Sequence, residues 1–177
     1  AVDLDQRAKA TLDEYLHLRD VGELMACIKP WEGFDEFFDA LFNKLVDCND
    51  SDREALLDLI PQLRGLTSMV TVENAIGRNF EFLEDVLIDA PRADKHLAAA
   101  AASAMATGVC SCAIFAQPNF AAVPNKAEWL SSVVTAAVAH TSDAAFLQAF
   151  AAQLKATWPK VQPLVGEKAD ALIPKLK

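Results

Sequence analysis

The sequence predicts an all-α protein built from stacked antiparallel helical hairpins of the HEAT type, with eight or nine helices. Apolar residues recur at helical spacing along almost the whole chain, and no alternating pattern bounded by Asn-Gly or Asp-Gly turns interrupts them. Residues that begin and end helices divide this pattern into segments. The short connections between segments favour antiparallel neighbours, as in a helical superhelix.

The first hairpin is predicted from its polar boundaries. The first helix is expected over residues 3–18, with Leu12 and Tyr15 on its apolar stripe. Asp20 is a good N-cap for a second helix through Ile28, because its carboxylate can accept an otherwise unpaired N–H. Pro30 ends that helix, since proline cannot continue the hydrogen-bond pattern.

The third and fourth helices form the next expected hairpin. Residues 31–48 carry a stripe of phenylalanines, which is typical of a core helix. Ser51-Asp-Arg-Glu54 has the spacing of a capping box and predicts the start of a helix that extends to about Leu66. Pro61 lies inside this segment and predicts a bend or a break.

The remaining helices are separated by proline and glycine. A fifth helix is expected over residues 71–87, and a sixth over residues 91–107 with Gly108 at its C-terminal cap. Residues 117–125 contain two Pro-Asn pairs and predict a loop, which divides the chain into a domain of residues 1–116 and an extension of residues 125–177 packed on it. Helices are expected in the extension over residues 127–140, 143–158 and 163–176.

The charge balance argues against nucleic acid as a direct ligand. The chain has 16 Lys and Arg against 25 Asp and Glu, a formal net charge of −9, and therefore repels phosphate backbones and favours a basic protein partner. No apolar run is long enough to span a membrane, and no signal peptide opens the chain. Because the chain starts without Met, we expect a module of a larger protein, and we also expect this module to be monomeric.

The sequence offers no catalytic, cofactor or metal site. The cysteines at 27, 48, 110 and 112 lack the spacing of a zinc site, which predicts reduced thiols in an intracellular compartment. The three histidines are scattered, and the six glycines form no phosphate-binding loop. We therefore expect a protein that is not an enzyme and needs no cofactor.

An acidic segment, Glu84-Asp85-Val-Leu-Ile-Asp89-Ala-Pro91, is the candidate functional site. Asp85 and Asp89 are four residues apart, so they are neighbours on one helix face or at a helix end if the fifth helix extends that far, and two like charges there are unfavourable. They also lie at the partly negative C-terminal end of the fifth helix, which suggests that they serve a partner. The alternative is that Asp89 caps the sixth helix, and the two roles are compatible.

Four segments together resemble the MA-3 domain, and they occur in the right order over about residues 9–110. They are Glu14-Tyr15-Leu16-His17-Leu18-Arg19-Asp20 with Glu23, then Arg53-Glu54 before Leu56, Leu57 and Leu63, then the acidic segment through Pro91, and then Ala93, Leu97 and Gly108. The resemblance is closest to the MA-3 domain of eukaryotic translation initiation factor 4G and extends to programmed cell death protein 4. The alanine-rich residues 97–106 depart from the family, which is usually bulkier there.

The resemblance implies a non-enzymatic, cytoplasmic module that binds initiation factor 4A, a DEAD-box RNA helicase, through the acidic loop and modulates cap-dependent translation initiation. Asp85 and Asp89 match the helicase-contacting carboxylates of the family, with Pro91 fixing the loop and Glu84 beside them. One alternative is a repressor that inhibits the helicase, as in programmed cell death protein 4. Another is an unrelated helical-repeat scaffold that binds a different partner through its concave face.

Overall fold

The structure is a computed structural model that describes residues 3–166. Within these residues all regular secondary structure is helical, which confirms the all-α prediction. The α-helices are α1 Leu4–Leu18, α2 Val21–Ile28, α3 Asp35–Val46, α4 Asp50–Leu59, α5 Met69–Asp89, α6 Ala93–Ala106, α7 Lys126–Ala139 and α8 Ala144–Val165. Short 3-10 helices occur at η1 Ile60–Leu63, η2 Cys112–Ala116 and η3 Pro118–Ala122.

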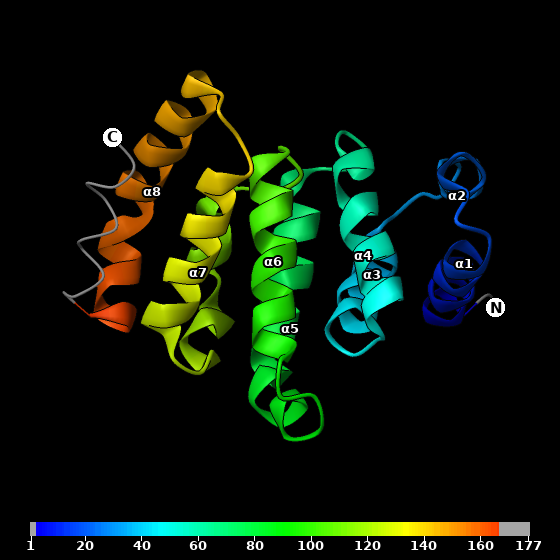
Figure 1. Cartoon of the computed structure of the whole chain (residues 1–177), viewed down its shortest axis with the longest axis horizontal. Helices are drawn as coiled ribbons and strands as arrows, with labels where there is room; N and C mark the ends of the chain where they lie inside the picture. Colours follow the sequence, from blue (N-terminus) through cyan, green and yellow to red (C-terminus); the bar gives the residue numbers. More distant parts are fainter. Residues whose placement is uncertain (1–2, 167–177) are drawn as a thin grey trace.

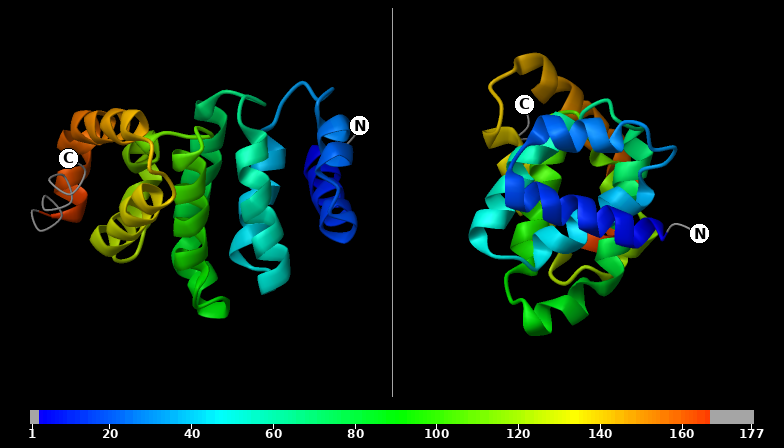
Figure 2. Two further views of the ribbon diagram at one scale, coloured as in Figure 1. Left: turned by 45° about the horizontal axis from the view of Figure 1, so that its top comes forward. Right: turned by 90° about the vertical axis from the view of Figure 1, so that its right-hand side faces the viewer.

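The helices stack as hairpins in a row, from α1 and α2 at one end to α8 at the other (Figures 1 and 2). α1 packs on α3 and α3 on α5, which makes one layer. α4 packs on α6 and α6 on α7, which makes the second layer. This arrangement confirms the predicted stack of antiparallel hairpins.

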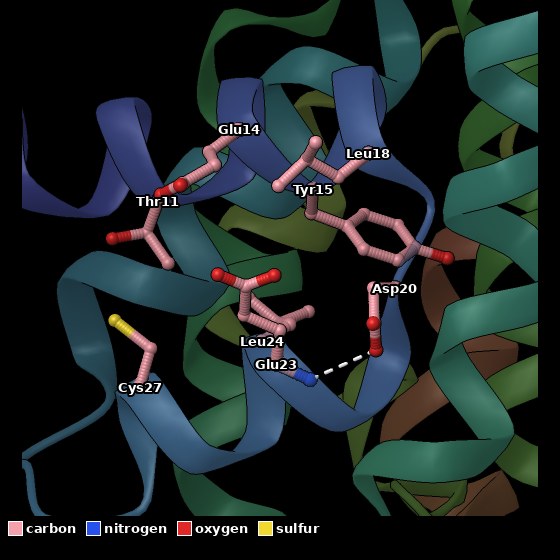
Figure 3. A pocket seen from close by; sticks show the side chains of 8 residues that line it. All are labelled: Thr11, Glu14, Tyr15, Leu18, Asp20, Glu23, Leu24 and Cys27. Atoms are coloured by element: carbon pink, nitrogen blue, oxygen red, sulfur yellow. Dashed lines mark hydrogen bonds between the residues drawn. The ribbon is translucent and has the colours of Figure 1, made fainter.

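The first segment that resembles the MA-3 domain, Glu14 to Asp20 with Glu23, lies in the α1–α2 hairpin. The Asp20 carboxylate accepts the Glu23 N–H at 3.0 Å and caps α2 as predicted (Figure 3). Tyr15 is buried and donates its hydroxyl to the carbonyl oxygen of Ala55 at 3.3 Å, which ties α1 to α4. Glu14 and Glu23 stay exposed beside a small pocket of about 100 Å³ between the two helices.

Arg19 links the first two hairpins from a left-handed backbone position. Its φ is 60° and ψ is 27°, a left-handed conformation that residues with a Cβ adopt at a cost of about 1–2 kcal/mol. Its guanidinium donates to the Asp52 carboxylate at 2.8 Å and to the Ser51 carbonyl oxygen at 3.2 Å. The side chain therefore offsets the strain of its own backbone.

We expect Arg19→Ala to lower the free energy of unfolding by about 1–2 kcal/mol, because the link to α4 is lost while the backbone strain remains. Arg19→Gly loses the same link but relieves the strain, so it should be the more stable variant by about 1 kcal/mol. Urea unfolding of both variants measures the difference. A glycine variant that is less stable than the alanine variant would contradict this account.

α3 and α4 differ from the sequence prediction at their starts. α3 begins at Asp35 rather than at Trp31. Phe34 is its N-cap, and the φ and ψ of Phe34, −125° and 6°, are not helical. The predicted capping box at Ser51 is wrong: α4 begins at Asp50, and Asn49 accepts the Asp52 N–H at 2.8 Å. Both side chains fit the cap rule, but the Ser51 hydroxyl accepts from Arg19 instead.

The predicted fourth helix breaks before Pro61. α4 ends at Leu59, and the chain continues as η1 through Leu63, so the helix does not reach Leu66 as a continuous element. Ile60 and Leu63 remain buried, and η1 packs on both α4 and α6. Proline thus changes the path of the chain without removing these side chains from the core.

α5 and α6 form the central hairpin. α5 is longer than predicted at both ends, and α6 begins at Ala93, two residues after Pro91. The end of α6 agrees with the prediction: Gly108 has φ +79°, its N–H donates to Met105 at 3.3 Å, and the Val109 N–H donates to Ala104 at 2.8 Å. These two bonds form a Schellman motif, which requires the left-handed residue that glycine provides.

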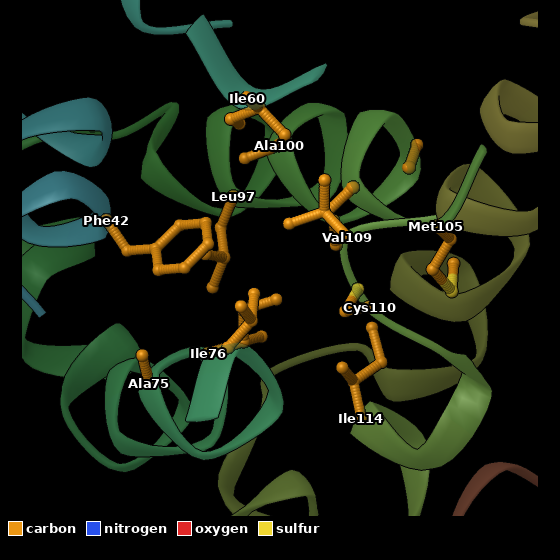
Figure 4. Packing of buried hydrophobic residues seen from close by; sticks show 14 of the residues in the cluster. Phe42, Ile60, Ala75, Ile76, Leu97, Ala100, Met105, Val109, Cys110 and Ile114 are labelled. Atoms are coloured by element: carbon orange, nitrogen blue, oxygen red, sulfur yellow. The ribbon is translucent and has the colours of Figure 1, made fainter. Parts of the chain in front are cut away.

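The alanine-rich sequence of α6 follows from its central position. α3, α4, α5, η1 and α7 all contact this helix, so its side chains are buried on nearly every face. Figure 4 shows Ala100 beneath Ile60 of η1, with Leu97 beside Phe42 of α3. Small side chains let neighbouring backbones approach closely, so the alanines of residues 97–106 suit the tight packing around this helix.

The predicted loop, residues 117–125, contains the 3-10 helix η3, and a second 3-10 helix, η2, directly precedes it. Residues 112–122 form η2 and η3, which carry the fully buried Phe115 and Phe120. Trp129 of α7 packs edge-on against Phe80 of α5 with ring centroids 5.2 Å apart, and both rings contact Phe120. The Trp129 indole N–H also donates to the Asp94 carbonyl oxygen at 2.9 Å.

α7 and α8 follow the prediction closely at their starts. Asp143 caps α8 by accepting the Ala145 N–H at 2.9 Å. α8 continues through Pro159 and Pro163 to Val165, so Pro163 does not begin a new helix as predicted. The rest of the predicted ninth helix, up to residue 176, lies outside the described residues.

The four cysteines are free and differ in accessibility. Cys27 is exposed beside the pocket between α1 and α2 (Figure 3), and Cys48 is half-buried. Cys110 and Cys112 are buried, and burial together with the Glu73 carboxylate raises the pKa of the Cys112 thiol to about 12. Burial likewise raises the pKa of Cys110.

We expect Cys27 to react with a maleimide at pH 7 on the order of a hundredfold faster than Cys110 or Cys112, because the thiolate is the nucleophile. Mass spectrometry of the labelled native protein measures the site-specific rates. Cys27→Ser should remove the fast phase, and unfolding in urea should expose all remaining thiols. Fast native labelling of Cys110 or Cys112 would show that this part of the core opens readily.

Candidate partner-binding surface

The last two turns of α5 present the candidate acidic residues. Asp85 lies within the helix and Asp89 is its last residue, so the structure places them on a helix end rather than on a loop. Both side chains are exposed, and their spacing of one turn puts them on the same face of α5. The structure therefore brings these two carboxylates together.

Asp85 and Asp89 serve no cap or ion pair within residues 3–166. α6 begins with Arg92 as its N-cap and without a side-chain cap, so the interpretation of Asp89 as the cap of this helix is wrong. No basic residue lies in the last turn of α5 to offset the two charges. Negative charge at a helix C-terminus is unfavourable by about 0.3–1 kcal/mol per residue. Neither carboxylate therefore stabilises the described fold through a cap or an ion pair.

Glu84 and Pro91 occupy different places from that pair. Glu84 is exposed but lies about 100° around the helix from Asp85, since each residue turns an α-helix by that angle. Pro91 is exposed in the turn between α5 and α6, which closes with the Ala93 N–H donating to Ala90 at 3.0 Å. Pro91 therefore restricts the turn next to Asp89, whereas Glu84 faces another side.

Neighbouring acidic residues that the sequence did not single out lie at the same edge of the molecule. The α3–α4 turn and the α5–α6 turn both lie at the lower edge in Figure 1, and the former carries the exposed Asp47 and Asp50. Asp50 pairs with Arg53 at 2.6 Å. These turns are about forty residues apart in sequence, so local patterns do not reveal that they are neighbours.

His96 adds no positive charge to this edge at neutral pH. Burial, together with the positive charges of Arg53 and Arg92, lowers the pKa of His96 below its usual value. A histidine with a lowered pKa is neutral near pH 7. His96 therefore does not offset the carboxylates of this edge, whose positive charges include those of Arg53 and Arg92.

The described residues contain neither a metal-binding cluster nor a membrane-spanning helix that would suggest a different function. Among residues 3–166, no three His, Cys, Asp or Glu side chains gather closely enough to hold a metal ion. No described helix combines the length and apolar character that a membrane crossing requires. Exposed carboxylates on a rigid helix can accept charge-assisted hydrogen bonds from arginine or lysine, which suits a protein interface.

A comparison with known families identifies the helical stack. The sequence profile of the MA3 domain matches residues 4–111, more than half of the chain. The chain belongs to the MA3 domain family. The MA3 domain is a helical protein-interaction module found in translation-related proteins. No curated protein and no solved structure matches the chain significantly.

The MA3 match begins at the first residue of α1 and ends just after α6. It includes Asp85, Asp89 and Pro91, so the acidic helix end is part of the MA3 domain. α7 and α8 lie beyond the matched residues, yet α7 packs directly on α6 of the MA3 domain. The MA3 domain therefore shares its core with the helix that follows.

Proposed function

We propose that this MA3 domain binds a DEAD-box RNA helicase of the initiation factor 4A type through the face of α5 formed by Asp85 and Asp89. One observation carries the proposal: the two carboxylates share an exposed helix face at a helix C-terminus and pair with nothing in residues 3–166. Their charges cost the fold stability. A basic surface on the partner would pair with both carboxylates and relieve their repulsion on binding, which would strengthen the complex.

The module acts as part of a cytoplasmic scaffold like initiation factor 4G and supports the helicase during cap-dependent initiation. The formal net charge of −9 fits this role, because the domain would repel RNA and leave the nucleic acid to the helicase. Its contribution is positioning, so no catalytic residue is required of the chain.

Calorimetric titration of the purified helicase with the whole chain, with and without single-stranded RNA, tests the proposal. We expect saturable binding that weakens as salt is raised, because exposed charges are screened at high ionic strength. An unwinding assay with the same proteins then separates support from inhibition of the helicase. Absence of binding at low salt, with folded chain and active helicase, would refute the proposal.

A further inference from the structure

A groove of about 290 Å³ opens between α1, α3 and α5, next to the acidic helix end. Asp5 and Lys9 line it from α1, Glu36 and Asp39 from α3, and Arg78 and Phe82 from α5. These three helices form one layer of the stack, so residues from three separate sequence segments meet there. The sequence alone gives no indication of this groove.

Phe82 is the unusual residue of the groove. Its side chain is 57% exposed, whereas Phe80, two positions earlier on the same helix, is fully buried. An aromatic ring in water forgoes the free energy that burial would provide. Because Phe82 lines a groove, a partner that inserts an apolar side chain there could cover the ring.

The groove is continuous with the acidic face of α5. Arg78, Phe82, Asp85 and Asp89 follow one another at spacings of four, three and four residues, so they form one stripe along the helix. The Arg78 guanidinium is occupied by Asp39 at 2.8 Å and Asp35 at 3.9 Å. Arg78 therefore does not neutralise the carboxylates further along the stripe.

The charge around the groove favours a basic partner. Asp5 and Glu36 form no ion pair within the described residues, and Lys9 is the one cation in the lining besides the paired Arg78. Burial raises the pKa of Asp39, and the bond from Arg78 opposes this shift. With Asp85 and Asp89, the combined surface is predominantly acidic.

We infer that the helicase-binding surface extends from Asp85 and Asp89 into this groove, where Phe82 contacts an apolar side chain on a basic segment of the helicase. This inference rests on the proposed function and adds an apolar anchor to its charged contacts. A central apolar anchor surrounded by polar contacts is the usual arrangement of a binding hot spot. The partner segment should therefore carry an aliphatic or aromatic residue flanked by lysine or arginine.

The test compares Phe82→Ala with Val70→Ala in helicase titrations. Val70 is a matched control because it is 60% exposed on the same helix, about 18 Å away along the helix axis. We expect Phe82→Ala to weaken binding about tenfold or more, and Val70→Ala to change it less than about twofold. Phe82→Leu should retain part of the affinity, and circular dichroism should show the same melting temperature for every variant.

Charge is tested separately with the double variant Asp5→Asn, Glu36→Gln. We expect severalfold weaker binding and a shallower dependence of the dissociation constant on salt. An unchanged affinity and salt dependence would refute the basic character of the partner segment. The melting temperature again serves as the folding control.

The outcomes distinguish this inference from the proposed function. If the wild-type chain binds the helicase and Asp85→Asn, Asp89→Asn weakens binding while Phe82→Ala does not, the groove is not part of the interface and the proposed function stands. If the wild-type chain does not bind at all, both are wrong. If Phe82→Ala instead disrupts self-association in analytical ultracentrifugation without changing helicase affinity, a second copy of the chain occupies the groove and the inference is overturned.

Discussion

The double variant Asp85→Asn, Asp89→Asn should bind the helicase about 2–4 kcal/mol more weakly than the wild type, roughly thirty- to a thousandfold in Kd. Asparagine keeps the size and part of the hydrogen-bonding capacity of aspartate but removes the charge. The loss therefore reports on charge-assisted contacts to the partner's basic residues. Calorimetric titration of wild type and variant against the same helicase preparation measures it.

The same variant should be as stable as the wild type or more stable, by up to about 1 kcal/mol. The structure assigns neither carboxylate a cap or an ion pair within residues 3–166, and α5 has no basic residue in its last turn. Removing two like charges from a helix C-terminus relieves an unfavourable interaction. Weaker binding with undiminished stability would be the signature of residues kept for function.

Glu54 and Asp58 provide a matched control for this double variant. They are exposed acidic residues with the same four-residue spacing, on α4 rather than α5. Glu54→Gln, Asp58→Asn changes the net charge by the same amount, so it should alter affinity less than about threefold through the overall field. Equal losses in the two double variants would show that net charge, rather than a local contact, controls binding.

Trp129→Ala should lower the free energy of unfolding by about 3–5 kcal/mol, a large part of the stability of a typical domain. The indole is buried against Phe80 of α5 and Phe115 of η2, and it donates to the Asp94 carbonyl at the start of α6. We propose on this basis that α7 and the MA3-matched residues unfold together. The melting temperature should fall by roughly 10 °C or more in a single transition.

Trp129→Phe is the control for this prediction. It keeps an aromatic ring in the cluster but loses the bond to Asp94, so it should cost about 1–2 kcal/mol. A chain that ends at residue 116 should lose cooperativity, because Phe80 and Phe115 would face water. Two separate transitions in the wild type, with the larger one unaffected by Trp129→Ala, would instead indicate independent parts.

The sequence by itself determined where most helices lie and how several of them start and stop. Asp20 and Asp143 cap the helices that they precede, and Gly108 ends α6 in a Schellman motif. These features depend on hydrogen bonds among residues within about five positions of one another, so local sequence specifies them. The acidic segment was also visible, because its charges and spacing are local properties.

Competition between local signals was decided by the tertiary structure. Asn49 and Ser51 are both acceptable caps for α4, and the contact of Ser51 with Arg19, thirty-two positions away, accompanies the choice of Asn49. Residues 117–125 have the composition of a loop, yet Phe120 is buried against rings from α5 and α7. Burial of apolar side chains against distant elements outweighs the weak local preference there.

The surface around the acidic helix end also depended on the tertiary structure. Phe82 and Phe80 look alike in the sequence, but Phe80 is buried against Phe120 of η3 and Trp129 of α7, whereas Phe82 is exposed at the groove beside α1 and α3. Likewise, Asp47 and Asp50 come to the edge that carries Asp89 because consecutive hairpins turn at the same side of the stack. A surface combines residues that are far apart in the chain, and their proximity is a property of helix packing rather than of any local pattern.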